Sequence, residues 1–306
     1  MKFINLKSRA AEAFLPCQTV LCIGNFDGVH LGHRQLVDTV ITTYERLKQD
    51  NADIVTGAWF FDTNFYKTNQ EIYTIDEKLE VFASLGLDYA IVADFNDMKS
   101  LSPDVFVNDV LRGECHCIHA VCGENFRFGA FASGDAEALS RLMDGNVTVV
   151  PLLSTNDAVI SSSYIRSLLN GGYIERANYL LSRNYSISES VIHGKALGRK
   201  LGIPTINQNV HNKKLILKNG IYATVCYIDG QKHFGVTNVG VRPTVEETDT
   251  KNVETYIIDF NGDCYGKTVK LEFIHRIRDE MKFQSVDALV AQIQKDIEQT
   301  KKYFDK

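Results

Sequence analysis

The feature that most constrains the fold is the regular alternation of short apolar runs with helix-spaced apolar residues through the first half of the chain. The apolar runs, which predict strands, lie at 19–23, 54–61, 89–92, 118–122 and 147–150. Helical spacing occupies the segments between them, at 31–47, 75–85, 103–111 and 135–143. Strands that alternate with helices indicate parallel βαβ units, so we predict a doubly wound parallel α/β sheet.

The pattern changes near residue 185. Two further helices are predicted first, at 162–169 and 174–181. After them come short β-rich runs separated by turn residues, at 185–192, 220–228, 233–239, 253–260 and 268–273. Such spacing is typical of a small antiparallel barrel, and Leu289, Ile293 and Ile297 predict a terminal helix that packs on it. We therefore expect one domain at residues 1–184 and a second at 185–306.

Composition limits the class of protein. The chain has 306 residues, of which 44% are hydrophobic and 23% charged, and these values suit two globular domains. A formal net charge of −5 argues against general binding to nucleic acid or to anionic lipid. The sequence has no run of about 18 apolar residues and begins without the pattern of a secretory signal, so we expect a cytoplasmic protein with no membrane span. No pattern predicts the oligomeric state.

The seven cysteines favour a reducing compartment. An odd number of cysteines in a chain of this size fits free thiols better than a disulfide framework. Only Cys115, Cys117 and Cys122 cluster, close to His116 and His119, and the residue types alone would allow a metal site there. The segment from Cys117 to Cys122 reads as a buried strand, which we favour over the metal site.

The segment Gly24–His33, GNFDGVHLGH, is the first motif with a chemical meaning. It follows a predicted strand and opens a predicted helix, whose N-terminus offers free N–H groups to phosphate. Its glycines allow a tight turn and a close approach to a ligand. His30 and His33 are three residues apart, so both can face one phosphate chain and donate hydrogen bonds to a charged leaving group. The alternative is a capped helix with two surface histidines, but the order strand, loop, H-x-G-H and helix favours phosphate binding.

These residues resemble a known family. GNFDGVHLGH, CGENFRFG at 122–129 and ISSSYIR at 160–166 resemble the N-terminal domain of bacterial bifunctional riboflavin kinase/FMN adenylyltransferases (FAD synthetases). The resemblance implies that His30, His33 and Arg166 are catalytic and that Asn125 and Arg127 lie on the flavin side. It also implies ATP binding by Gly24, Asn25, Phe26, Gly28, Gly32, Ser161, Ser162 and Ser163. Ser163 stands where this family usually has threonine, and the hydroxyl is retained.

One turn departs from the family pattern. The family usually carries a Phe-x-Pro-His-Pro-like turn after its second strand, whereas residues 59–66 read WFFDTNFY, with neither proline nor histidine. In the family this turn lies close to the flavin side. Its loss therefore raises a question about FMN affinity or the rate of adenylylation, and not about ATP binding.

The second motif, HGKALGRKLGIPTIN at 193–207, opens the second predicted domain. Its glycines can let backbone amides surround phosphates. Thr205 and Asn207 are two residues apart, so on an extended chain their side chains point the same way, and oxygen ligands of this kind suit Mg²⁺. Taken alone, the motif would more often be an ordinary β-turn.

This second motif resembles the G-x-x-x-G-R-x-L-G-x-P-T-x-N signature of riboflavin kinases. Further matches follow in family order at 219–223, 238–244, 253–256, 259–260, 265–267 and 277–283, so the resemblance covers nearly the whole chain. It implies ATP binding by Gly194, Gly198 and Gly202, and Mg²⁺ binding by Thr205 and Asn207. It also implies that Glu254 is the general base and that Arg278 contacts flavin or nucleotide.

The resemblance implies two reactions on small molecules. The C-terminal barrel is expected to convert riboflavin and ATP to FMN and ADP, and the N-terminal domain to convert FMN and ATP to FAD and pyrophosphate, both with Mg²⁺. The altered turn keeps open a second hypothesis, a riboflavin kinase with an impaired adenylyltransferase domain. A non-catalytic flavin or nucleotide sensor is a third, which the intact His30, His33, Thr205, Asn207 and Glu254 argue against. RNA binding by the barrel is opposed by the acidic balance.

Overall fold

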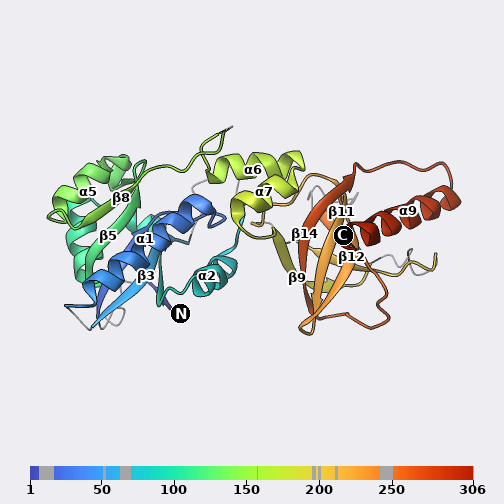
Figure 1. Cartoon of the computed structure of the whole chain (residues 1–306), viewed down its shortest axis with the longest axis horizontal. Helices are drawn as coiled ribbons and strands as arrows, with labels where there is room; N and C mark the ends of the chain where they lie inside the picture. The colour runs from blue at the N-terminus through green and yellow to red at the C-terminus, as the bar shows by residue number, and fades with distance from the viewer. Residues whose placement is uncertain are drawn as a thin grey trace. The chain divides into compact units, whose positions relative to one another are not determined.

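The computed structural model describes residues 1–6, 17–50, 53–62, 70–156, 158–194, 198, 201–210, 213–241 and 251–305. The chain divides into two compact units, Met1–Ser162 and Ser163–Lys306. In Figure 1 the first unit is coloured from blue to green and carries a sheet with helices, and the second runs from yellow to red and carries a barrel.

The first unit is built on a six-stranded sheet in the order β1-β4-β3-β2-β5-β8. Each neighbouring pair is parallel, which confirms the predicted parallel sheet. The strands are β1 Lys2–Asn5, β2 Gln18–Ile23, β3 Ile54–Phe61, β4 Tyr89–Ala93, β5 Cys117–Gly123 and β8 Val147–Val150. Strand β1 was not predicted, because its four residues at the edge of the sheet carry no long apolar run.

Helices cover both faces of this sheet. They are α1 Leu31–Leu47, α2 Ile75–Ser84, α3 Phe95–Met98, α4 Pro103–Val105 and α5 Ala136–Leu142, with a π-helix η1 Phe106–Glu114 and a 3₁₀-helix η2 Ala130–Ala132. Val20 and Cys22 of β2 pack in one core cluster with α1 and α2, whereas Leu21 and Ile23 pack in another with η1 and α5. Because both faces are buried, the strands read as continuous apolar runs. Two short strands, β6 Arg127–Phe128 and β7 Gly134–Asp135, form a separate hairpin.

The second unit contains a closed barrel in the order β10-β13-β12-β11-β14-β9, whose neighbouring strands are antiparallel. The elements are α6 Ser162–Gly171, α7 Ile174–Leu181, β9 Ser186–Ile192, β10 Thr205–Asn209, β11 Gly220–Ile228, β12 Gln231–Val241, β13 Lys251–Ile257, β14 Thr268–Arg278 and α9 Val286–Phe304. The predicted barrel and terminal helix are therefore confirmed.

The barrel strands carry two kinds of buried contact. A ladder of hydroxyl groups joins Thr224 to Thr237 (2.8 Å) and Thr237 to Thr255 (2.9 Å), all three fully buried. Helix α9 packs through Ile293 and Ile297 on an apolar cluster formed by strand residues that include Val236 and Ile221. The start of α9 is capped by Ser285, whose side chain accepts the N–H of Ala288 at 3.2 Å. Leu289, Ile293 and Asp296 of α9 line the pocket described below.

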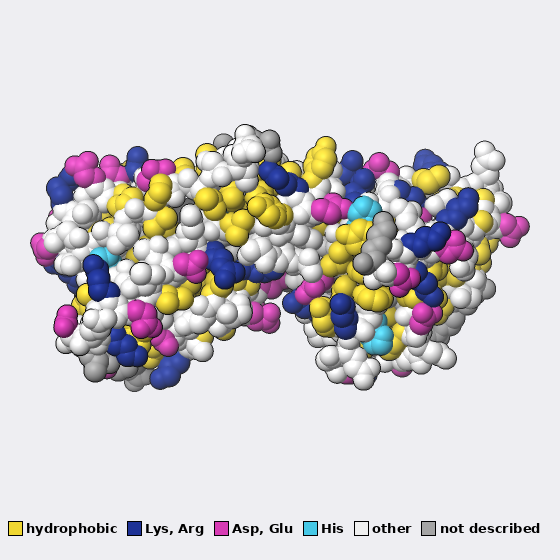
Figure 2. All heavy atoms as spheres, in the orientation of Figure 1, with side chains coloured by type: hydrophobic (Ala, Val, Ile, Leu, Met, Phe, Trp, Pro, Cys, Tyr) yellow, Lys and Arg dark blue, Asp and Glu magenta, His cyan; other side chains and the backbone are white. Residues whose placement is uncertain are grey.

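Charged side chains are mixed on the surface. On the face shown in Figure 2, lysine and arginine side chains are interspersed with aspartate and glutamate. Among the described residues, no helix has both the length and the apolar character needed to cross a membrane.

Candidate active sites

The first candidate site lies at the carboxyl ends of the parallel strands. The loop after β2 bends sharply, with positive φ at Phe26 (52°), Gly28 (79°) and Val29 (38°). The buried carboxylate of Asp27 holds this loop, because one of its oxygens accepts the backbone N–H groups of Ile72 (2.9 Å) and Tyr73 (3.4 Å). These bonds tie the loop to the segment before α2, which favours a fixed loop conformation.

The sheet topology brings a second loop to the same edge. The chain moves from β2 to β3 and β4 on one side, and β5 then pairs with β2 on the other side. Such a reversal of strand order is where α/β sheets bind ligands. Asn125 lies in the turn after β5 and Arg127 in β6, and the rings of Phe126 and Phe128 stack with centroids 5.6 Å apart. The predicted flavin-side residues therefore follow β5, the strand that pairs with β2.

His30 and His33 lie together at the start of α1. Their rings stack with centroids 3.7 Å apart and an interplanar angle of 17°. His30 is the N-cap residue of α1, and its Nδ1 accepts the backbone N–H of His33 at 3.4 Å. The neutral His30 ring that accepts at Nδ1 carries its proton on Nε2. This leaves an N–H donor beside the positive end of a 17-residue helix.

Burial sets the charge of both histidines. His30 is 5% exposed, and burial lowers its pKa to about 4. Burial, followed by the neighbouring His30 and Lys78, holds the pKa of His33 well below its ordinary value. Both imidazoles are therefore neutral near pH 7. Among the described residues, Nδ1 of His33 is buried without a hydrogen-bond partner.

The low pKa of His30 predicts a loss of stability in mild acid. In the unfolded chain His30 becomes protonated below pH 6.5, its ordinary pKa. In the folded protein its ring stays neutral until the pH falls to about 4. The unfolded state then binds more protons, so the free energy of unfolding falls as pH decreases through this range. A shift of this size corresponds to about 3 kcal/mol. Thermal unfolding between pH 7 and pH 4 should show a smaller decrease for His30→Asn than for the wild type, and equal slopes would contradict the assignment.

The predicted serines and arginine fall at the start of α6. The hydroxyl of Ser162 donates to the carbonyl oxygen of Asp27 at 2.8 Å, which ties the first residue of α6 to the histidine loop. Ser161 comes directly before this residue. Ser163 and Arg166 follow within α6, in the second compact unit, so their role toward the histidines stays a prediction.

The second candidate site is a row of polar side chains across three barrel strands. Asn207 of β10 lies opposite Glu254 of β13, and Glu254 lies opposite Asn238 of β12. In the next row, Thr205 lies opposite Tyr256. Residues paired in this way share one face of the sheet. The barrel wall therefore collects the predicted base and the two predicted metal ligands on one surface.

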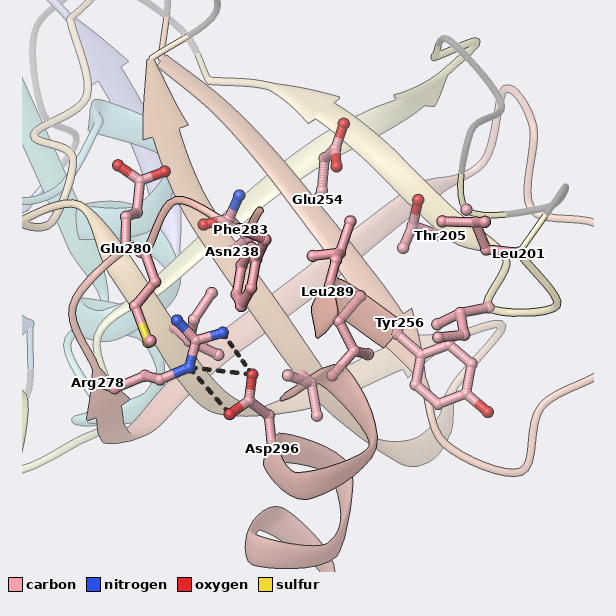
Figure 3. Close-up of a pocket in the computed structure, with 16 residues that line it drawn as sticks. Leu201, Thr205, Asn238, Glu254, Tyr256, Arg278, Glu280, Phe283, Leu289 and Asp296 are labelled. Atoms are coloured by element: carbon pink, nitrogen blue, oxygen red, sulfur yellow. Dashed lines mark hydrogen bonds and ion pairs between the residues drawn. The ribbon is translucent and has the colours of Figure 1, made fainter. Parts of the chain in front are cut away.

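This surface forms one side of a pocket of about 290 Å³. Figure 3 shows Thr205, Glu254 and Tyr256 on the strands and Leu289 and Asp296 on α9 around it. The predicted residues Gly198 and Arg278 line the same pocket. The mixture of aliphatic, aromatic and a few polar groups suits a flat organic ligand with one reactive polar end.

The side-chain amide of Asn252 connects the predicted base, Glu254, with the predicted metal ligand Asn207. Nδ2 of Asn252 lies 3.1 Å from Oε1 of Glu254 and 3.4 Å from Oδ1 of Asn207, and it donates to both. Asn252 is 8% exposed and was not predicted. Its only sequence signal is the period of two in a strand, which puts a polar residue two positions before Glu254 on the same face. Asn252 therefore orients both the carboxylate and the amide of the site.

The glycines of the second motif have different roles. A Cβ at Gly194 would lie 2.4 Å from Nδ2 of Asn207, so only glycine lets the backbone pass the site here. Gly202 has a φ of +72°, which a tight turn before β10 requires. Residues 195–197 and 199–200 of the motif lie outside the described residues.

Arg278 has a partner within the protein. Its guanidinium donates to the carboxylate of Asp296 on α9, from Nε at 3.0 Å and from Nη2 at 2.7 Å. Asp296 is 2% exposed and also accepts from Gln292 at 2.9 Å. Asp296 was not predicted from the sequence, although residues 292, 296 and 300 form a polar stripe at a spacing of four along the helix. Contact between Arg278 and a ligand stays a prediction.

A second pocket of about 500 Å³ adjoins the first at Thr205, which lines both. Its other lining residues include Pro204, Phe260, Asp263 and Tyr265. Tyr265 stacks on His193, with ring centroids 3.9 Å apart. Molecules bound in the two pockets would therefore lie next to each other at Thr205, and such proximity favours transfer of a group between them.

The predicted cluster at Cys115–Cys122 is part of the core. Cys117 and Cys122 are buried in β5, as the strand reading predicted, and the seven thiols are free. Among the described residues, no group of three or more His, Cys, Asp or Glu is arranged to hold a metal ion.

The doubly wound sheet with its histidine loop and the barrel with paired pockets define a two-domain transferase of the nucleotide-using class. The family models described as FAD synthetase and riboflavin kinase match residues 15–164 and 181–304. The bifunctional riboflavin kinase/FMN adenylyltransferase of Bacillus subtilis (strain 168) is 33% identical over 298 residues, which cover 94% of this chain and 93% of that protein. The protein of the same description from Listeria monocytogenes is 33% identical over 299 residues, which cover 94% of this chain and 93% of that protein. The chain belongs to the family of bifunctional riboflavin kinase/FMN adenylyltransferases.

A solved structure supports the fold. A crystal structure described as a macrolide-efflux protein from Streptococcus pneumoniae matches with a TM-score of 0.90 and 28% sequence identity. The match covers 98% of this chain and 99% of that chain. The likeness therefore extends over both units.

Proposed function

We propose that the chain carries out two successive reactions, phosphorylation of riboflavin to FMN and adenylylation of FMN to FAD. The observation that carries this proposal is the position of Glu254 in the wall of one pocket, beside Thr205, which also borders a second pocket. A base must touch the acceptor, so riboflavin occupies the pocket of Glu254 and ATP the other. Family membership of both halves supports the same two reactions.

In the kinase site, Glu254 accepts the proton of the terminal ribityl hydroxyl as its oxygen attacks the γ-phosphorus of ATP. The bond from the γ-phosphorus to the bridging oxygen breaks, and ADP leaves. Asn252 keeps the carboxylate oriented through its 3.1 Å hydrogen bond. The glycines 194, 198 and 202 allow the backbone to approach the nucleotide. The mixed pocket lining holds the isoalloxazine ring, with Arg278 at its edge.

The donor set of the same wall fits Mg²⁺. The Thr205 hydroxyl and the Asn207 amide oxygen are hard ligands on one face of β10, and the magnesium ion usually takes only a few protein ligands and completes its shell with phosphate and water. Nδ2 of Asn252 donates only a long bond of 3.4 Å to the Asn207 oxygen. Bound there, Mg²⁺ would offset the negative charge of the phosphates.

In the N-terminal site, a phosphate oxygen of FMN attacks the α-phosphorus of ATP in line. The bond from the α-phosphorus to the bridging oxygen breaks, and pyrophosphate leaves with the negative charge. The N–H groups at the start of α1, Nε2–H of His30, His33, Ser162 and Arg166 bind the phosphates and the developing charge. The loop residues Asn25 and Phe26 complete the nucleotide side, and Asn125 and Arg127 the flavin side.

The boundary between the adenylyltransferase domain and the kinase domain is proposed to lie between residues 184 and 185. Helices α6 and α7 then belong to the adenylyltransferase domain, although Ser163–Lys306 forms one compact unit. The family model for riboflavin kinase begins at residue 181. The partners are small-molecule substrates in the cytoplasm, and we expect no binding to nucleic acid.

The direct test is to incubate the purified protein with riboflavin, ATP and Mg²⁺ and to separate the flavins by chromatography. We expect FMN to appear first and FAD to accumulate from it, with neither product when the metal is chelated. Accumulation of FMN alone, also when FMN and ATP are supplied directly, would support the kinase with an impaired adenylyltransferase. Residues 63–66 of the altered turn lie outside the described residues, so this experiment decides the question. The absence of both products would support the sensor hypothesis.

A further inference from the structure

Lys78 is a buried cation in the N-terminal unit. It lies on α2, four residues before Phe82, and is 1% exposed. Its Nζ lies 5.6 Å from the centroid of the Phe60 ring. Apart from this ring, no described residue provides the side-chain ammonium of Lys78 with a hydrogen-bond or ion-pair partner. A buried ammonium without a counter-charge is costly, so an anionic ligand is the natural partner for it.

An aromatic cluster joins Lys78 to the histidine loop. The ring of Phe60, under the Lys78 ammonium, lies 6.3 Å from the ring of Phe26. Phe82 lies 5.2 Å from the same Phe26 ring. The Phe26 ring also lies close to the His33 ring, with centroids 5.1 Å apart. Helix α2 therefore presents its buried cation to the cluster on which the catalytic histidine also rests, at the carboxyl ends of β2 and β3.

His33 gives an independent sign that a ligand belongs here. Its Nδ1 is buried and has no hydrogen-bond partner among the described residues. Burial is the main reason that the pKa of His33 is low, and the positive charge of Lys78 contributes to it. A polyphosphate has enough oxygens to accept from the ammonium, the imidazole and the helix N-terminus at once.

We infer that Lys78 binds the pyrophosphate portion of ATP in the N-terminal site and stabilises it as the leaving group. This inference rests on the proposed adenylylation. As the bond to the α-phosphorus breaks, the electron pair moves to the bridging oxygen, and the Lys78 ammonium donates a charge-assisted hydrogen bond to the pyrophosphate. The competing role is structural, in which the cation serves only to pack on Phe60.

The test compares Lys78→Met with Lys78→Arg and with Lys99→Met. Lys99 is an exposed lysine of the same unit that pairs with Asn96 at 2.8 Å, and it serves as the matched control. The readouts are KM for ATP and inhibition by inorganic pyrophosphate in the conversion of FMN to FAD. We expect Lys78→Met to raise KM for ATP, and to raise the pyrophosphate concentration needed for inhibition, each by about 10- to 100-fold, which is the contribution of a charged hydrogen bond. The effect should be smaller for Lys78→Arg and absent for Lys99→Met.

Because Lys78 lies in the first compact unit and the kinase pocket in the second, kinase activity does not report the folding of the variant's N-terminal unit, and the circular dichroism spectrum and thermal unfolding curve do so instead. If Lys78→Met is unfolded by these measures, Lys78→Gln takes its place in the comparison. A folded variant with unchanged KM and unchanged pyrophosphate inhibition would overturn the inference. If the wild type makes no FAD, the proposed adenylylation fails, and calorimetry with inorganic pyrophosphate then tests Lys78 alone. Equal affinity of the wild type and the Lys78→Met variant in that titration would also overturn it.

Discussion

Replacement of Glu254 by glutamine is expected to lower the rate of riboflavin phosphorylation by roughly 10²- to 10⁴-fold, the range that a general base contributes. Glutamine has the same length and can still accept the 3.1 Å hydrogen bond from Asn252, so the pocket should keep its shape. What it cannot do is accept the proton of the attacking hydroxyl. We therefore expect kcat to fall while KM for riboflavin changes little.

The second reaction of the same chain is the control for this experiment. FAD formation from added FMN should be unchanged in Glu254→Gln, because the histidine loop lies in the first compact unit and Glu254 in the second. Asn252→Ala provides a graded comparison, since it leaves the carboxylate and removes only its orienting partner. Kinase turnover in Glu254→Gln at the wild-type rate would exclude this residue as the base.

Much of the fold could be predicted because burial leaves a direct mark on the sequence. The strands of the parallel sheet are buried on both faces, so each appears as an unbroken apolar run. The segment 103–111 shows the limit of this reasoning. It was predicted as one α-helix, but it is a short α-helix that continues as the π-helix η1. Apolar spacing alone does not distinguish an α-helix from a π-helix here, because either conformation can bury Phe106, Val107 and Val110 on one side.

The polar residues that complete the sites were harder to predict. Asn252, Asp296 and Lys78 belong to residue types that are usually exposed, and no local motif marks them. Each depends on a partner that only the folded chain brings near. Asn252 contacts Glu254 on the same strand face, Asp296 contacts Arg278 at the end of β14, and Lys78 lies over the aromatic cluster under α2. Motifs therefore marked the groups that are proposed to react, whereas the residues that position these groups became visible only from the packing of separate elements.

Replacement of His30 is expected to be the most damaging change in the adenylyltransferase site. In the proposed mechanism the ring supplies a neutral Nε2–H donor where charge develops on the leaving pyrophosphate, and loss of one such donor typically lowers kcat by about 10²- to 10³-fold. His30→Ala also removes the N-cap of α1, which costs only about 1 kcal/mol of stability. His30→Asn separates the two effects, because asparagine is a good N-cap residue but cannot reach as far as the imidazole.

Comparison of the two variants therefore tests the chemical role directly. Both should lose FAD formation to a similar extent, although only His30→Ala loses the cap, and both should phosphorylate riboflavin at the wild-type rate. His116→Asn is a suitable control, since His116 is exposed and its φ of 47° is a conformation that asparagine tolerates. FAD formation at the wild-type rate in either variant would show that His30 does not stabilise the leaving group.

The pH dependence gives a separate check. Because burial keeps the His30 ring neutral with a pKa of about 4, its N–H donor should be present throughout the neutral range. Protonation of His30 should therefore not change kcat between pH 6 and pH 8.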